Sequence, residues 1–226
     1  MKRFFFVTLI LFLCHELRGV ANEPKPSSSF VLAPKCTFTA KSNSFSIKQY
    51  YDRNERLGWQ IWVCPKQGAA YQLPEYDPLD SSYDDPAAWS LSPDEHWLAR
   101  TQRTGSGTSI LLLYHHTNDS RFTPAGGNRF GDVVYHFYAK HSGLTKEQQL
   151  IDHSRFEFYR WEDSRFLIIS LSGESTLFQP MWVTDKWLVA YDLKRKSLFL
   201  TDSLIEKNIG RIYPIVHPAV ESDALR

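Results

Sequence analysis

PAAWSLSPDEHWLARTQRTGSGTSILLLY, residues 86–114, contains three short runs of apolar and aromatic residues separated by two turn sequences. In the first turn, SPD, proline presets φ and aspartate accepts a backbone hydrogen bond. The second turn, GSG, supplies glycines that tolerate the backbone angles of a tight hairpin. This stretch therefore predicts three consecutive antiparallel strands.

Runs of the same kind follow along most of the chain. Their β-branched and aromatic content and their length favour strands; they are FTAKSNSFSIKQYY, GWQIWVC, VVYHFYAK, FEFYRW, RFLIISL, LFQPMWV, WLVAYDL and SLFLTD. A short helix is predicted for residues 144–153, where Thr145 and Gln148 form a capping box. The predicted class is all-β with one minor helix.

A pattern of tryptophan, acidic turn and aromatic–aliphatic pair occurs three times. The residues that carry it are Trp89, Asp94 and Trp97, then Trp161 and Asp163, then Trp182, Asp185 and Trp187. We expect each aspartate to lie in a hairpin turn and the leading tryptophans to pack between hairpins.

The first copy, residues 86–111, resembles the WD40-like repeat of the periplasmic Tol-system propellers. That repeat runs W-S-P-D-G-x-x-I-A, then R-x-G, then an apolar strand; here two residues are inserted, and Glu95 stands where glycine is usual. The resemblance implies antiparallel hairpins in a small or irregular propeller-like arrangement. The leading tryptophans are separated by 72 and 21 residues, which fits no blade period of about 40–45 residues. A β-sandwich or an open barrel is the alternative.

The first 21 residues have the layout of a cleavable signal peptide. A basic head of Lys2 and Arg3 precedes an apolar run, and Gly19 and Ala21 supply small residues at −3 and −1. Export to the periplasm or the exterior is therefore predicted, with an uncleaved anchor or a lipid on Cys14 as alternatives. Residues 22–34 are predicted to be a flexible leader and residues 35–226 a single β domain. No later segment is long and apolar enough for a membrane span.

Two cysteines, Cys36 and Cys64, follow the predicted signal. In an exported chain they most simply form a disulfide, which would stabilise the fold by about 3–4 kcal/mol. Two separate thiols are the alternative. The formal net charge of +1 provides no basic surface of the kind that binds nucleic acid.

An acidic segment precedes the first hairpin. Its carboxylates, which include candidate Ca²⁺ ligands, are Glu75, Asp77, Asp80, Asp84 and Asp85. Calcium prefers such oxygen ligands, but the spacing is not that of an EF-hand and no central glycine allows its sharp turn. We interpret the segment as a solvated acidic loop, with Ca²⁺ as the alternative and no other cofactor predicted. The histidines lack the recurring spacing of zinc ligands; His115 and His116 are adjacent and point to opposite faces of a strand.

No catalytic motif occurs in the chain. Thr104 and Thr108 stand where a nucleophile elbow requires glycine. Trp62 is out of phase with the apolar face of its strand, which makes it a candidate sugar-stacking residue, although core packing is the interpretation we favour. The leading hypothesis is an exported, non-enzymatic protein that acts through protein contacts. A carbohydrate-binding module and a hydrolase with a dispersed active site are the alternatives.

Overall fold

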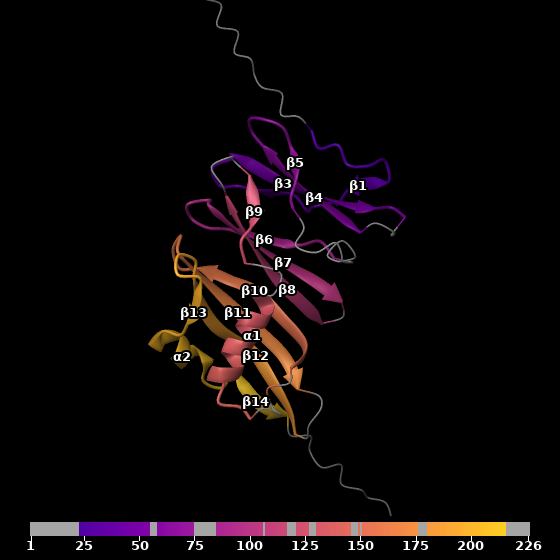
Figure 1. Ribbon diagram of the computed structural model, residues 1–226. Coiled ribbons are helices and arrows are strands. Elements are labelled where there is room, and N and C mark those ends of the chain that lie inside the picture. Colours follow the sequence, from indigo (N-terminus) through magenta and orange to yellow (C-terminus); the bar gives the residue numbers. More distant parts are fainter. Residues whose placement is uncertain are drawn as a thin grey trace, which may run out of the picture.

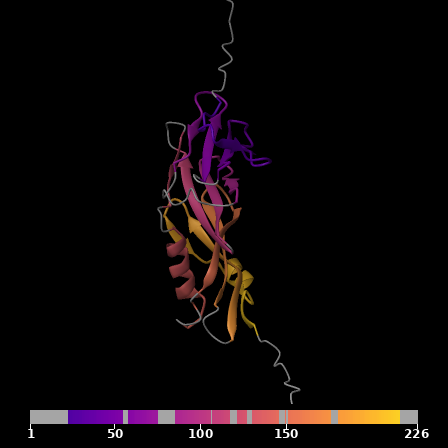
Figure 2. The same ribbon diagram turned by 90° about the vertical axis from the view of Figure 1, so that its right-hand side faces the viewer.

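The computed structural model describes residues 23–54, 58–74, 85–105, 107–116, 121–126, 130–145, 149, 151–175 and 180–215. In this part of the chain two β-sheets and two helices form an elongated body (Figures 1 and 2). The smaller sheet lies at one end and the larger sheet extends to the other. Both sheets are open, so the all-β, irregular arrangement of antiparallel hairpins that the sequence predicts is confirmed.

The smaller sheet is antiparallel and has the order β1-β3-β4-β5, with β2 paired to β3. Its strands are β1 (Phe30–Leu32), β2 (Phe38–Thr39), β3 (Phe45–Asp52), β4 (Trp59–Pro65) and β5 (Tyr71–Gln72). Alternation along β4 is as predicted, because Ile61 and Val63 are buried while Gln60 and Trp62 are half-exposed on the other face.

The larger sheet has the order β13-β12-β11-β10-β8-β7-β6, with β14 on β12 and β9 on β8. Its strands are β6 (Ala88–Leu91), β7 (Trp97–Gly105), β8 (Thr108–His116), β9 (Phe122–Pro124), β10 (Asp152–Trp161), β11 (Phe166–Ser175), β12 (Met181–Asp192), β13 (Ser197–Phe199) and β14 (Ile212–Ile215). The first three are the antiparallel strands predicted from residues 86–114. One parallel register pair, Arg155 with Ser109, joins β10 to β8.

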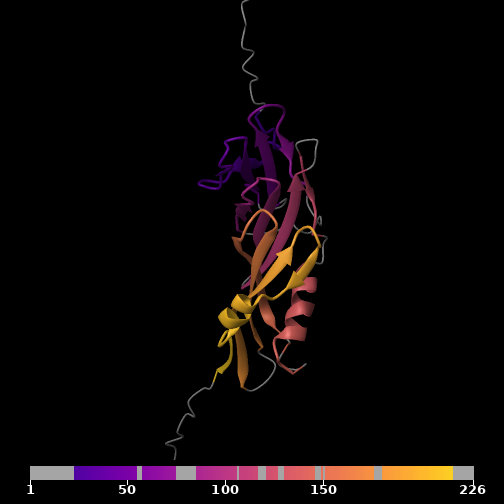
Figure 3. The same cartoon turned by 90° about the vertical axis from the view of Figure 1, so that its left-hand side faces the viewer.

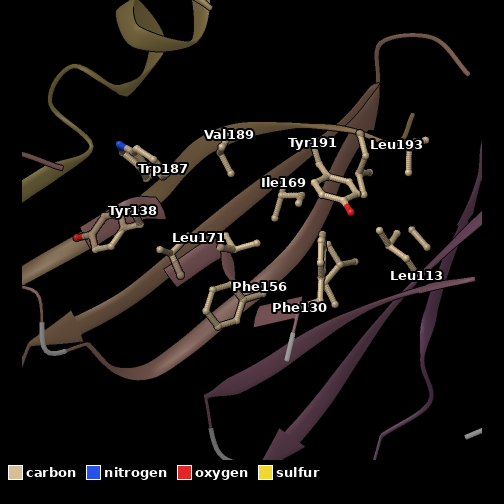
Figure 4. Packing of buried hydrophobic residues seen from close by; sticks show 14 residues of the cluster. Leu113, Phe130, Tyr138, Phe156, Ile169, Leu171, Trp187, Val189, Tyr191 and Leu193 are labelled. Atoms are coloured by element: carbon tan, nitrogen blue, oxygen red, sulfur yellow. The ribbon is translucent and has the colours of Figure 1, made fainter. Parts of the chain in front are cut away.

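The two helices, α1 (Phe130–His141) and α2 (Asp202–Asn208), cover opposite faces of the larger sheet (Figure 3). The faces follow the strand alternation: Leu167 and Ile169 belong to the core cluster under α1, whereas Ile168 packs with Leu204 of α2. Under α1 the aromatic rings meet edge to face, with Tyr138 and Trp187 5.2 Å apart at their centroids (Figure 4).

A second core lies between the two sheets. Ile47 and Ile61 of the smaller sheet pack in one cluster with Leu98 and Tyr114 of β7 and β8. The buried side chain of Gln49 adds a polar link, because its amide donates to the Ala87 carbonyl at 3.0 Å and accepts from the Ala87 N–H at 2.8 Å. One side-chain amide thus takes the place of a neighbouring strand at the start of β6.

The helices differ in position from the sequence prediction. Within residues 144–153, the described residues are not helical, and Asp152 and His153 begin β10. VVYHFYAK, predicted to be a strand, is instead part of α1. Phe130, Val134 and Tyr138 recur every four residues and bury one side of a helix, and this period prevails over their aromatic and β-branched composition.

The segment predicted to be a flexible leader contains a strand. Within residues 22–34, β1 pairs with β3, and the side chain of Phe30 is buried. The burial of that ring accounts for the order of this segment. The predicted signal, residues 1–21, lies outside the described residues. Among the residues that the structure describes, no helix has the length and apolar character needed to cross a membrane.

Candidate functional site

Three turns of the larger sheet come together and line a shallow, open cleft of about 610 Å³. They are the turns between β6 and β7, between β10 and β11, and between β12 and β13. The lining residues define what we call the turn cleft: Asp94, Trp97, Asp163, Ser164, Arg165, Leu193 and Lys194. Two of them, Asp94 and Asp163, are the turn aspartates of the first two copies of the sequence pattern.

The β6–β7 turn is held by its own side chains. Ser92 Oγ donates to Asp94 Oδ1 at 2.6 Å and accepts from the Trp97 N–H at 2.9 Å. The His96 N–H also donates to Asp94 Oδ1, at 3.2 Å. All of these partners lie within five residues of one another, so the bonds are local to the turn.

Glu95 adds a link from this turn to the smaller sheet. Its φ of 60° is in the left-handed region, which glycine adopts more readily than glutamate does. The carboxylate accepts from the Ser42 N–H at 2.9 Å and from the hydroxyls of Ser42 and Ser44. Burial raises the pKa of Glu95, but these donors outweigh burial and hold the pKa below its usual value.

The β10–β11 turn follows the same principle. Asp163 Oδ1 accepts from the backbone N–H groups of Arg165 at 2.6 Å and Phe166 at 3.0 Å. The side chains of Asp94 and Asp163 therefore both stabilise hairpin turns, as the sequence pattern predicts, and the structure brings the two turns to one cleft.

Arg165 connects the β10–β11 turn to the β12–β13 turn. Its guanidinium donates twice to Asp192, at 3.0 Å and 2.5 Å, and the N–H groups of Lys194 and Arg195 also donate to Asp192 Oδ1. Hydrogen bonding to Arg165 is the main reason why the pKa of this nearly buried carboxyl is well below its usual range. The pair holds the β10–β11 turn and the β12–β13 turn together.

Trp97 forms the aromatic wall of the turn cleft. Its ring contacts the ring of His115, with centroids 4.4 Å apart. Burial lowers the pKa of His115, and the nearby charges of His96 and His116 lower it further.

The other tryptophans of the sequence pattern lie away from the turn cleft. Trp89 packs over the buried guanidinium of Arg100, and the Trp161 indole N–H donates to Ser90 Oγ at 3.1 Å, joining β10 to β6. Trp182 pairs with Pro214, and Trp187 is in the core under α1.

The third copy of the pattern has no hairpin turn. Residues 182–187 lie within the single strand β12, and Lys186 has a φ of 51° beside a register shift. Asp185 forms an ion pair with Arg211 at 3.5 Å instead of closing a turn. In both the β12 bulge and the β6–β7 turn, an aspartate precedes a residue with positive φ: Asp185 precedes Lys186, and Asp94 precedes Glu95. This shared requirement explains why the two sequences are similar.

The predicted disulfide is not formed, and both cysteines are free thiols. The Gln49 amide donates to the Cys36 carbonyl, whereas Cys64 pairs with Ser46, which lies three residues before Gln49 in β3. Three residues of a strand span ~10 Å, which exceeds the Cα separation of a disulfide.

The acidic segment is described only at its end. Asp85 forms an ion pair with Arg103 at 3.0 Å, whereas Glu75, Asp77, Asp80 and Asp84 lie outside the described residues. Among the described residues no group of three or more His, Cys, Asp or Glu side chains gathers around a common point.

The sequence did not identify Arg165, Leu193 or Lys194 as members of the turn cleft. Arg165 could have been suspected from its position directly after an acidic turn. Leu193 and Lys194 carry no local signal, because only the pairing of β11 with β12 brings them beside Asp163.

Comparisons with known proteins do not identify a family for this chain. No family model and no curated protein matches the chain. Among solved structures, AtxE2 isopeptidase in its apo form superposes with a TM-score of 0.39 and 12% sequence identity, over 77% of this chain and 30% of that chain. The chain thus corresponds to less than a third of that protein's length, and a likeness of this size carries no argument about activity.

Proposed function

We propose that the protein is an exported, non-enzymatic β protein that acts by binding another protein through the turn cleft. The observation that carries this proposal is the composition of the cleft. The half-buried ring of Trp97 provides apolar area next to the buried Leu193, and charged groups of both signs surround it. Aromatic and arginine side chains within a polar rim are the features that protein–protein interfaces favour.

The fixed geometry of the three turns supports the same proposal. Asp94, Asp163 and Arg165 are each engaged in hydrogen bonds within or between the turns. A surface held in one shape before binding loses less conformational entropy when a partner docks. The cleft is also wide and open, which suits a protruding segment of a protein.

Export is the part of the proposal that rests on sequence alone. The basic head, the apolar run and the small residues before Asn22 support cleavage and secretion. Amino-terminal sequencing of protein recovered outside the cytoplasm tests this part. A mature chain that begins at Asn22 is expected, and a chain that still begins at Met1 would contradict it.

Capture from an envelope extract of the source organism tests the binding surface. We expect Lys194→Glu, which reverses a rim charge, and Ser164→Arg, which fills the cleft, to reduce recovery of a specific partner. The matched controls are Lys207→Glu and Ser203→Arg, exposed on α2 outside the cleft. Equal recovery by cleft variants and controls would show that the cleft is not the binding surface.

Carbohydrate binding at Trp62 is a second candidate. Trp62 is half-exposed on the outer face of β4, between Lys48 of β3 and Gln72 of β5. Its indole N–H donates to Gln60 Oε1 at 3.3 Å. A held aromatic ring flanked by amide and ammonium groups is suited to stack on a sugar.

A glycan array separates the two candidates. Binding that is lost in Trp62→Ala and retained in Ser164→Arg would favour carbohydrate. Absence of binding to any glycan by the unchanged protein would remove this second candidate.

A further inference from the structure

Two histidines lie opposite each other across the β7–β8 hairpin. The register pairs Trp97 with His115, so His96, directly before β7, lies opposite His116. The His116 N–H donates to the His96 carbonyl at 2.7 Å, and the two ring centroids are 6.2 Å apart with an interplanar angle of 37°. Both side chains therefore project from the same face of the hairpin, and His115 projects from the other.

This separation is near that of two imidazoles that share one ion. With metal–nitrogen bonds of about 2.0–2.1 Å, ring centres of two ligands lie roughly 4.5 Å apart at a right angle and roughly 5.2 Å apart at a tetrahedral angle. The observed 6.2 Å is longer than either separation, so the two rings must move closer together to bind one ion. Small rotations about the side-chain bonds are enough to aim one nitrogen of each ring at a common point.

The surroundings restrain the pair and leave room for water. The ring of His116 packs against Phe122 with centroids 4.9 Å apart. His116 also lines a cavity of about 340 Å³ between the two sheets, together with Ser44, Lys66 and Tyr71. Water in this space can complete the coordination of an ion.

Nearby carboxylates are engaged elsewhere. Glu95 bonds to Ser42 and Ser44, and Asp94 closes its turn. Two imidazoles and water would thus form the ligand set.

The geometry points to a binding site for one divalent late transition-metal ion between His96 and His116. Imidazole ligands suit Zn²⁺, Ni²⁺ and Cu²⁺, and the usual order of affinity places Cu²⁺ first. Ca²⁺ and Mg²⁺ require oxygen ligands and do not bind there. The inference is independent of the proposed partner.

Calorimetric titration of the full chain, purified without a histidine tag, tests the site with Cu²⁺, Ni²⁺ and Zn²⁺ in turn. We expect one ion per chain, with Cu²⁺ bound most tightly. Replacing a residue that hydrogen-bonds to a metal ligand lowers metal affinity by about 10- to 100-fold, and removing a ligand itself lowers it at least as much. We therefore expect His96→Ala and His116→Ala each to lower metal affinity by about 10- to 100-fold or more. Quenching of tryptophan fluorescence by Cu²⁺ gives a second readout, because Trp97 adjoins His96.

His115→Ala is the matched control, because this neighbour projects from the opposite face. It should bind the ion as the unchanged protein does. His96 is exposed, so its replacement leaves the fold intact even if the half-buried His116 cannot be replaced. Failure of the unchanged protein to bind any of the three ions, undiminished binding by His96→Ala, or equal loss in His115→Ala would each overturn the inference.

Discussion

Glu95 shows how one residue can depart from a repeat pattern and still fit the turn. Its backbone is left-handed, a conformation that costs a non-glycine residue about 1–2 kcal/mol. Its carboxylate gains bonds to Ser42 and Ser44 that a glycine would lack. The departure from the pattern is thus tied to a contact between the two sheets.

Replacing Glu95 separates backbone strain from side-chain bonding. Glu95→Ala and Glu95→Gly remove the same bonds, but only glycine adopts a φ of 60° freely. We expect Glu95→Gly to be more stable than Glu95→Ala by about 1 kcal/mol in urea unfolding. Equal stability would indicate that the turn relaxes in the alanine variant.

Asp192 makes stability depend on pH. Its pKa is lowered in the folded state, chiefly by Arg165. The carboxylate therefore stabilises the fold above its unfolded pKa of about 3.9, and this contribution is lost as the pH falls further. Asp192→Asn should lower Tm at pH 7.

The pH series supplies the control for Asp192. The difference in Tm between Asp192→Asn and the unchanged protein should narrow as the pH falls below about 4. Asp185→Asn removes only a surface ion pair with Arg211 and should leave Tm nearly unchanged. A difference that stays constant from pH 7 to pH 3 would argue against an ionic role for Asp192.

At the scale of elements, local patterns predicted most strands but assigned VVYHFYAK, which forms part of α1, to a strand. Turn chemistry at Asp94 and Asp163 predicted two hairpins correctly, because the aspartates bond within their own turns. The pattern at Asp185 failed because a bulge and a turn have similar requirements. The turn cleft depends on strand order, which no local pattern contains.

Gly173 lies where β11 meets the start of β10. A Cβ there would lie 1.9 Å from Ile151 Cγ2 and 3.2 Å from the Asp152 carbonyl oxygen. We expect Gly173→Ala to destabilise the fold by about 1–3 kcal/mol.

A double-mutant cycle identifies the cause at Gly173. Ile151→Ala removes the clashing methyl, so the double variant should be more stable than the sum of the single changes predicts. If the changes in the free energy of unfolding of the two single variants simply add, the contact with Ile151 is not the cause of the destabilisation.

Asn208 closes the gap between β13 and β14 along β12. Its side chain accepts from the Leu188 N–H at 2.7 Å and donates to the Leu188 carbonyl at 2.8 Å. Asn208→Ala should cost about 1–3 kcal/mol, because these two backbone groups lose their partners.

Hydrogen exchange at the Leu188 amide measures this loss directly. The amide should exchange faster in Asn208→Ala, whereas Lys207→Ala, on the exposed side of α2, should not change it. Unchanged protection in both variants would mean that water or another group replaces Asn208.

At the scale of the whole molecule, both cysteines lie in the region of the smaller sheet but are held beside different residues of β3. Cys36 lies beside Gln49, and Cys64 of β4 is paired with Ser46. Alkylation of the denatured, unreduced protein followed by peptide mass spectrometry should find both thiols modified. A linked pair of peptides would instead support the disulfide that the sequence suggested.

The junction between β8 and β10 has a single register pair, which is parallel, whereas the other strand pairs of the larger sheet are antiparallel and have at least three. β1 and β14 lie at opposite ends of the body (Figure 1), so a pull on the two ends crosses this junction. If the protein is held at both ends under tension, β8 and β10 should separate first. The antiparallel hairpins β7–β8 and β10–β11 should keep their backbone hydrogen bonds.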